Sequence, residues 1–337
     1  MLQLFMGWLL IRINPMTRKN FALTVALLFL SFLLPSFAQR RSNSQPPAIE
    51  VAAQTSALQG LVNRAAQRAV ERFASKNFTE SNLSITLIDL RDVGHPVQAS
   101  FRGEERIYPA SVVKLFYLAA AHRWMEDGRI RETDELKRGL HDMIVDSSND
   151  ATQFILDVLT DTTSGPELAP DQMRKWAYKR NAVNRYYDSM GYRNINVNQK
   201  TFCEDSYGRE HAFRGAHGEN RNKLTTNATA RLLMEIATGR AVSPARSAQM
   251  MELLKRDFSG TSNDPDDQGH GFTGIALAPG ARLWSKAGWT STTRHDAAYI
   301  ELPNGAKFVL VIFTTDHANE RDIIPTIARV ILEEFNH

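Results

Sequence analysis

Segments with the pattern of β-strands occur in only two parts of this chain, and a long helical stretch separates them. Residues 83–90 alternate apolar and polar side chains, and residues 97–101 form a matching strand after a turn. The second group lies near the C-terminus, at 281–288, 296–302 and 307–314. The simplest architecture is therefore an α+β fold with one mixed or antiparallel sheet built from both chain ends and flanked by helices, with an all-helical subdomain inserted between the strand groups.

Apolar residues recur at helical spacing in most of the remaining chain. We expect helices at 57–75, 133–143, 151–159, 170–190, 226–239, 243–255 and 320–335, and one that opens at Pro109 and runs to about residue 127. Residues 194–223 show no sustained period, so we expect a long loop there, of the kind that is uncommon unless it has a function.

The N-terminal residues predict an export signal. Arg18 and Lys19 precede an apolar run at residues 21–34, and small residues that resemble a cleavage site follow it. We therefore expect residues 1–38 to be removed and the mature protein to be periplasmic or secreted. Met16 is an alternative start, because it would begin a signal of more ordinary length.

We expect a linker at residues 39–52 and one domain at 53–337. No later segment reaches the roughly 20 apolar residues that a membrane-spanning helix needs. The formal charge of +3 disappears with the cations of the leader, so neither a nucleic acid nor a membrane is expected as a partner. A single cysteine, Cys203, excludes an internal disulfide. We expect a monomer that binds a small-molecule substrate.

Ser111 and Lys114 stand three positions apart near the start of the helix that Pro109 opens. Side chains at this spacing are neighbours on a helix, so the amine can reach the hydroxyl. A lysine that burial or a second cation keeps neutral can take the proton of a serine. The pair is typical of a serine nucleophile with its own base, although a helix end and a solvated lysine would contain the same residues.

Two further motifs follow in the chain. Ser147 and Asn149 lie just before the helix expected at 151–159, where capping alone would favour such residues. Lys286 and Gly288 fall on the first of the three C-terminal strands. Each motif has an ordinary explanation by itself, but the order of all three is unusual.

In this order the three motifs resemble those of the serine beta-lactamase and penicillin-binding protein superfamily, most closely its class A beta-lactamase-like branch. Residues 225–233 and 294–299 are similar to further segments of that family, and the resemblance extends from about Ala57 to the C-terminus. It implies the beta-lactamase/transpeptidase-like fold and the hydrolysis of a beta-lactam or a related amide through an acyl-serine intermediate.

The resemblance also implies roles for single residues. Ser111 would attack the substrate carbonyl, and Lys114 would be its base or would relay the proton. Ser147 would pass a proton to the leaving nitrogen with Lys286 beside it. Asn149 would form hydrogen bonds with Lys114 and with a substrate amide.

Three residues of the C-terminal strands would complete the substrate site. The backbone N–H groups of Ser111 and Trp289 would form the oxyanion hole. Gly288 would leave room for a substrate along the strand edge. Arg294 would bind the substrate carboxylate, or it would be a solvated arginine at a strand end.

The chain departs from the family pattern in two residues, one that bears on substrate recognition and one that bears on turnover. Ala287 stands where the family has a threonine or serine, which removes a hydroxyl expected near the substrate carboxylate. The glutamate that activates the deacylating water has no clear counterpart. Glu210 has the best spacing, and Glu204 and Glu219 are rivals.

Three functions therefore remain open: a beta-lactamase, a penicillin-binding-type D-Ala-D-Ala carboxypeptidase or esterase, and a non-catalytic binding module with this fold. We expect no metal and no organic cofactor. The glycines of residues 269–274 do not follow a strand, and Cys203 with His211 and His217 matches no familiar zinc spacing.

Overall fold

The computed structural model of the protein describes residues 48–336, which belong to one compact unit that starts at Pro47. The predicted export signal at 1–38, the alternative start at Met16 and most of the predicted linker lie outside the described residues. The first described helix, α2 (Ala48–Arg72), begins at Ala48 and not at Ala57 as predicted. None of the described helices is long and apolar enough to cross a membrane.

The sheet is antiparallel and has six strands in the order β2-β1-β6-β5-β4-β3. β1 (Leu83–Asp89) lies between β2 (Val97–Phe101) and β6 (Lys307–Thr315), so the two ends of the chain meet at the centre of the sheet. β5 (Thr293–Glu301) and β4 (Arg282–Trp289) follow. The antiparallel sheet predicted from the sequence is confirmed, while the two-residue edge strand β3 (Lys255–Arg256) was not predicted.

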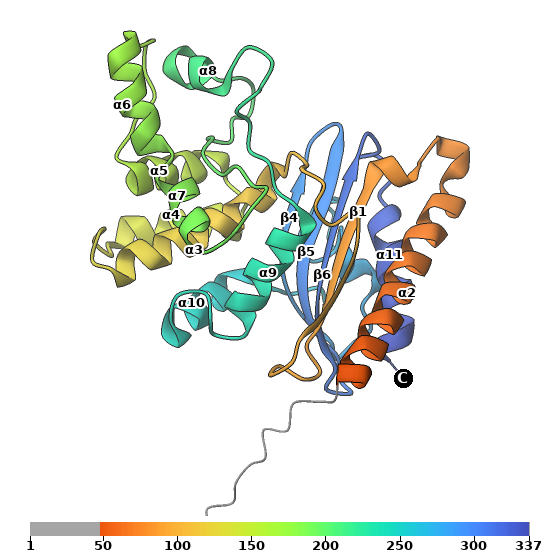
Figure 1. Cartoon of the computed structure of the whole chain (residues 1–337). Helices are drawn as coiled ribbons and strands as arrows, with labels where there is room; N and C mark the ends of the chain where they lie inside the picture. The colour runs from red at the N-terminus through yellow and green to blue at the C-terminus, as the bar shows by residue number, and fades with distance from the viewer. Residues whose placement is uncertain (1–47, 337) are drawn as a thin grey trace, which may run out of the picture. The chain divides into compact units, whose positions relative to one another are not determined.

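Each face of the sheet is buried under helices, because successive side chains of a strand point to opposite faces. Along β6, Phe308, Leu310 and Ile312 pack with α2 and with α11 (Ile323–Phe335). Val309 and Val311 belong to the second core, together with α9 (Thr226–Ala237) and the helical subdomain. Figure 1 shows α2 and α11 on one side of the sheet and α9 on the other. Burial of each such side chain contributes roughly 1.5–3 kcal/mol.

The helical subdomain surrounds α3, in which nearly every side chain is buried, including that of Lys114. The segment predicted as one helix at 170–190 forms two, and the segment predicted as a loop at 194–223 contains one short helix. The helices of this part and α10 beside it are α3 (Val113–Glu126), α4 (Asp134–Ile144), α5 (Asn149–Thr160), α6 (Pro170–Arg180), α7 (Ala182–Ser189), α8 (Gly208–Arg214) and α10 (Pro244–Leu254).

Candidate active site

Ser111 lies on a single 3₁₀ turn, η4 (Ala110–Val112), that leads into α3 at Val113. The prediction that Ser111 belongs to the helix itself is therefore wrong, because Ser111 lies on the 3₁₀ turn that precedes the helix. Ala110 has a φ of 45°, a left-handed conformation that costs a residue with a side chain roughly 1–2 kcal/mol. This strained turn leaves Ser111 partly exposed while Lys114, one helical turn later, is fully buried.

Gly288 is in direct contact with the turn that carries Ser111. A Cβ atom at this position would lie 2.7 Å from the Ser111 nitrogen and 2.8 Å from both the Pro109 oxygen and the Val112 nitrogen. All three are backbone atoms, so a side chain here would push β4 away from the turn. The glycine thus has a packing reason beyond the substrate clearance predicted from the sequence. Trp289 is the next residue of β4 after this contact.

The Lys114 amine is held by uncharged oxygen atoms. Its Nζ donates to the Ser147 carbonyl oxygen, to Asn149 Oδ1 at 3.0 Å and to Ser147 Oγ at 3.3 Å. Burial lowers the pKa of Lys114 from 10.5 to about 7, with a small opposing effect of Cys203. A substantial fraction of this amine is therefore neutral near pH 7, as a proton acceptor requires.

Lys286 approaches the same hydroxyl from the sheet. Its Nζ donates to Ser147 Oγ at 3.0 Å, to Gln268 Oε1 at 2.5 Å and to the Ala287 carbonyl oxygen at 2.8 Å. Burial, followed by repulsion from the Lys114 and Arg256 cations, holds the pKa of Lys286 well below its usual value. The structure therefore brings Lys114, Ser147, Asn149 and Lys286 together, next to the Ser111 turn.

The backbone around Ser147 explains how one residue meets both lysines. Ser147 has a φ of 57° in the connection between α4 and α5, and its carbonyl and hydroxyl oxygens both contact Lys114. Ser148 caps α5 by accepting a hydrogen bond from the Ala151 N–H at 3.1 Å. Asn149 is the first residue of α5, not part of the preceding loop as predicted.

Two residues near the lysines were missed by the sequence analysis. Gln268 contacts Lys286, as described above, and Cys203 Sγ accepts a hydrogen bond from Asn149 Nδ2 at 3.6 Å. Both come from irregular segments without periodicity or motif. No signal in the sequence points to them.

Glu210, on α8, forms an ion pair with an arginine. Its two carboxylate oxygens accept from Arg180 at 2.7 and 3.0 Å, one of them also from Ser164 Oγ at 3.0 Å, and Lys200 lies 3.6 Å away. The side chains of Arg180 and Glu210 are 0% and 1% exposed. The structure thus places Glu210 in a buried ion pair of the helical subdomain. Its rivals Glu204 and Glu219 are exposed.

Arg294 also binds to groups within the protein. Its guanidinium donates to Asp266 Oδ1 at 2.7 Å and to the Gly271 carbonyl oxygen at 2.6 Å, and it stacks on the Phe272 ring at 3.9 Å. Its side chain is 3% exposed. The alternative of a solvated arginine is wrong. Asp266, which would compete with a substrate carboxylate for Arg294, also contacts Arg321.

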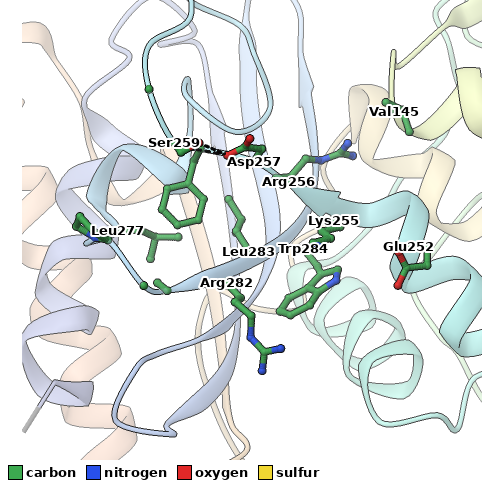
Figure 2. Close-up of a pocket in the computed structure, with 15 residues that line it drawn as sticks. Val145, Glu252, Lys255, Arg256, Asp257, Ser259, Leu277, Arg282, Leu283 and Trp284 are labelled. Carbon is green, nitrogen blue, oxygen red and sulfur yellow. Dashed lines mark hydrogen bonds between the residues drawn. The ribbon is translucent and has the colours of Figure 1, made fainter.

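A cavity of about 480 Å³ opens beside Ser147 and is rich in carboxylates. Ser147, Gln268 and Trp289 contribute to its lining. A larger cavity of about 960 Å³ lies along β3 and the start of β4 (Figure 2) and shares part of this lining. The acidic residues of the smaller cavity are Asp146, Asp257, Asp264, Asp266 and Asp267.

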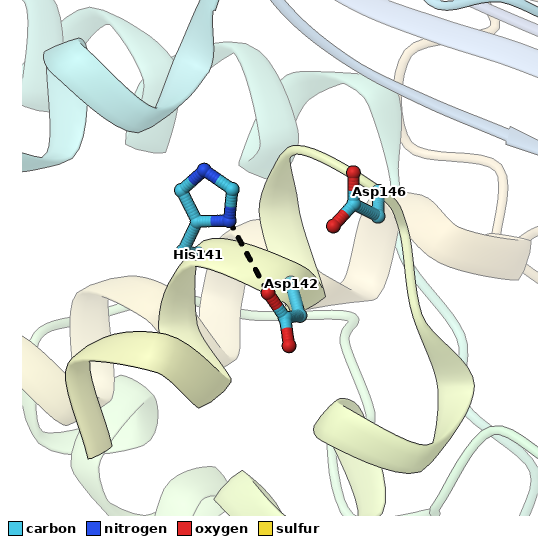
Figure 3. A group of neighbouring side chains, drawn as sticks. All are labelled: His141, Asp142 and Asp146. Atoms are coloured by element: carbon cyan, nitrogen blue, oxygen red, sulfur yellow. Dashed lines mark hydrogen bonds and ion pairs between the residues drawn. The ribbon is translucent and has the colours of Figure 1, made fainter. Parts of the chain in front are cut away.

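One group of side chains next to this cavity has the composition of a metal site. His141, Asp142 and Asp146 bring potential ligand atoms within 4.8 Å of one another (Figure 3). His141 Nδ1 lies 3.2 Å from Asp142 Oδ1, and both His141 and Asp146 are exposed. Exposed groups of this kind form without an ion, so we assign no metal to them.

Comparison with known proteins places the chain in a family. A family model described as the Beta-lactamase enzyme family matches residues 65–335, and the chain belongs to this family. It is 24% identical over 275 residues to a beta-lactamase of Proteus vulgaris, in an alignment that covers 78% of this chain and 93% of that protein.

Solved structures of the same fold agree with this assignment. A beta-lactamase of Sphaerobacter thermophilus superposes with a TM-score of 0.58 at 20% identity and covers 81% of this chain and 97% of its own. A mutant of PBP-A in an acyl-enzyme complex with penicillin G superposes with a TM-score of 0.55 at 18% identity, covering 87% and 99%. The predicted beta-lactamase-like fold is confirmed.

The buried pair of Arg180 and Glu210 predicts a large effect on stability. Arg180→Ala would remove the two hydrogen bonds of the guanidinium to Glu210 and leave only the more distant Lys200 as its cation, and breaking a buried pair in this way costs about 3–5 kcal/mol of unfolding free energy. The control is Arg174→Ala, because Arg174 and Asp171 form an exposed pair of the kind that contributes about 1 kcal/mol or less. Urea unfolding of both variants measures the difference, and equal small losses would contradict the burial of the pair.

Proposed function

We propose that this protein is an exported serine hydrolase that acts on beta-lactams or related amides through an acyl-serine intermediate. One observation carries the proposal: two buried lysines meet at the Ser147 hydroxyl, at 3.3 and 3.0 Å, beside the turn that carries Ser111. Membership of the Beta-lactamase enzyme family supports the same reaction class. Export rests on the N-terminal sequence alone.

The arrangement suits acyl transfer. Ser111 Oγ attacks the substrate carbonyl, and neutral Lys114 takes the proton of the hydroxyl directly or through Ser147. The N–H groups of Ser111 and Trp289, the first in contact with Gly288 and the second on the residue that follows Gly288, stabilise the oxygen of the tetrahedral intermediate. Ser147 then delivers a proton to the leaving nitrogen and is reprotonated from Lys286 or Lys114.

A second candidate, a penicillin-binding-type carboxypeptidase, is favoured by the pairing of Glu210. Hydrolysis of an acyl-enzyme needs a base for the attacking water, and the carboxylate with the best sequence spacing is bound to Arg180. Among the described residues, the hydrogen-bond partners of Lys114 are uncharged oxygens. A carboxypeptidase of this kind would be acylated by a beta-lactam and would then hydrolyse the acyl-enzyme slowly.

The acyl-serine predicts a covalent adduct that depends on one hydroxyl. Ser111→Ala should abolish the mass increase that the wild-type protein shows with penicillin G in intact mass spectrometry, because no nucleophile is left. Ser148→Ala is the control, since Ser148 only caps α5, and it should still be labelled. Labelling of Ser111→Ala would overturn the proposed nucleophile, and no adduct of the wild type with several beta-lactams would favour a binding module.

The low pKa of Lys114 predicts the pH dependence of acylation. Lys114 is neutral, and therefore able to accept a proton, above its pKa of about 7. The acylation rate should rise with pH through a midpoint near this value. Stopped-flow measurement with nitrocefin from pH 5 to 9 tests this, and Lys114→Arg, which stays charged, should remove the rising limb. A rate that falls with pH over this range would show that Lys114 is not the base.

Turnover separates the two candidate enzymes. A beta-lactamase should hydrolyse many equivalents of nitrocefin per active site, and its adduct with penicillin G should be transient. The carboxypeptidase should release about one equivalent and keep the adduct for hours. Following the acyl-enzyme by mass spectrometry over time therefore decides between them.

A further inference from the structure

Gln268 connects Lys286 on β4 with the backbone at the end of α4 through a buried amide. It comes from the irregular segment between β3 and η5 (Thr273–Ala276) and is 7% exposed. Its Oε1 accepts from Lys286 Nζ at 2.5 Å and from the Ala287 N–H at 3.2 Å. Its Nε2 donates to the carbonyl oxygens of Ile144 at 3.2 Å and Val145 at 2.9 Å. The oxygen and the nitrogen of the amide thus have two partners each.

The neighbours of Lys286 restrict where its proton can move. A charged lysine has three N–H groups, and a neutral one has two and a lone pair. Gln268 Oε1 and the Ala287 carbonyl oxygen can only accept, so they take two N–H groups in both states. The remaining tetrahedral position faces Ser147 Oγ at 3.0 Å. It holds an N–H when Lys286 is charged and a lone pair when Lys286 is neutral.

We propose that Gln268 is a positioning residue that directs the exchangeable proton of Lys286 toward Ser147. The inference deepens the proposed function and rests on it for its role in catalysis. Through Gln268, the amine on β4 and the connection that carries Ser147 are held at one separation, because the same amide contacts Lys286 and the backbone two and three residues before Ser147.

The amide suits this position better than the corresponding acid would. A neutral acceptor orients the Lys286 amine without a negative charge that would hold its proton. The donor end of the amide satisfies Ile144 and Val145, whose carbonyl oxygens would repel a carboxylate. Arg256, which also donates to the Ile144 oxygen at 3.0 Å, completes the connection between the sheet and α4.

Two substitutions of similar size test the role by titration of Lys286. Gln268→Glu places an anion on the amine and should raise the pKa of Lys286. Gln268→Leu removes the acceptor while keeping the volume and should lower it further. The titration is followed by the ¹³Cε shift of labelled lysine, assigned with Lys286→Arg. If Gln268 only filled space, Gln268→Leu, which keeps the volume, would leave the pKa of Lys286 unchanged, and that result would overturn the proposal.

The rate of acylation by nitrocefin is the second readout. Misplacement of the amine should slow acylation about 10- to 100-fold in both Gln268 variants. Gln59 provides the matched control, because its amide also bridges backbone groups, the N–H of Ser100 at 3.3 Å and the oxygen of Ser100 at 2.9 Å. Gln59→Glu and Gln59→Leu alter the opposite edge of the sheet and should lower the melting temperature without slowing acylation.

The two readouts keep this inference apart from the proposed function. Opposite pKa changes with slowed acylation support it. Opposite pKa changes with an unchanged acylation rate would overturn the positioning role. If no beta-lactam acylates the wild-type protein, the proposed function fails, and the titration alone then decides whether Gln268 orients Lys286.

Discussion

Two buried amines share one hydroxyl in this protein, and the rest of the site depends on that contact. Two ammonium groups on either side of Ser147 would repel each other in a region from which water is largely excluded. At least one of Lys114 and Lys286 is therefore neutral in the folded protein near neutral pH. This agrees with their partners, which are carbonyl, amide and hydroxyl oxygens.

The fold supplies these groups from three separate places. α3 carries Lys114, which is buried on that helix, the connection from α4 to α5 carries Ser147, and β4 carries Lys286. β4 can approach the nucleophile turn because Gly288 lacks a side chain. β4 is held in the sheet by β5 and β3, and the same sheet contains strands from both strand groups of the chain.

The sequence pattern was sufficient for the sheet, and the resemblance of the three motifs to a known family was sufficient for the groups that meet at Ser147. The strands show the expected alternation, and the residues of each short motif keep their relative positions because few bonds separate them. Gln268 and Cys203 could not be found in this way, since their roles depend on how irregular segments fold back on the site. The sequence did not predict the ion-pair partners of Glu210 and Arg294. These partners, Arg180 and Asp266, lie 30 and 28 positions away, and nothing local indicates that the charges pair in the interior.

The left-handed backbone at Ala110 and Ser147 has a consequence for evolution in the laboratory. Glycine adopts this conformation freely, so replacing either residue with glycine would relieve about 1 kcal/mol of backbone strain. At residue 147 the lost hydrogen bonds offset this relief, because the two buried lysines lose the hydroxyl that they share. At residue 110 the gain leaves every reacting group in place, whereas at residue 147 it deletes the hydroxyl that the lysines share. Relief of backbone strain therefore conflicts with the chemistry at residue 147 and is independent of it at residue 110.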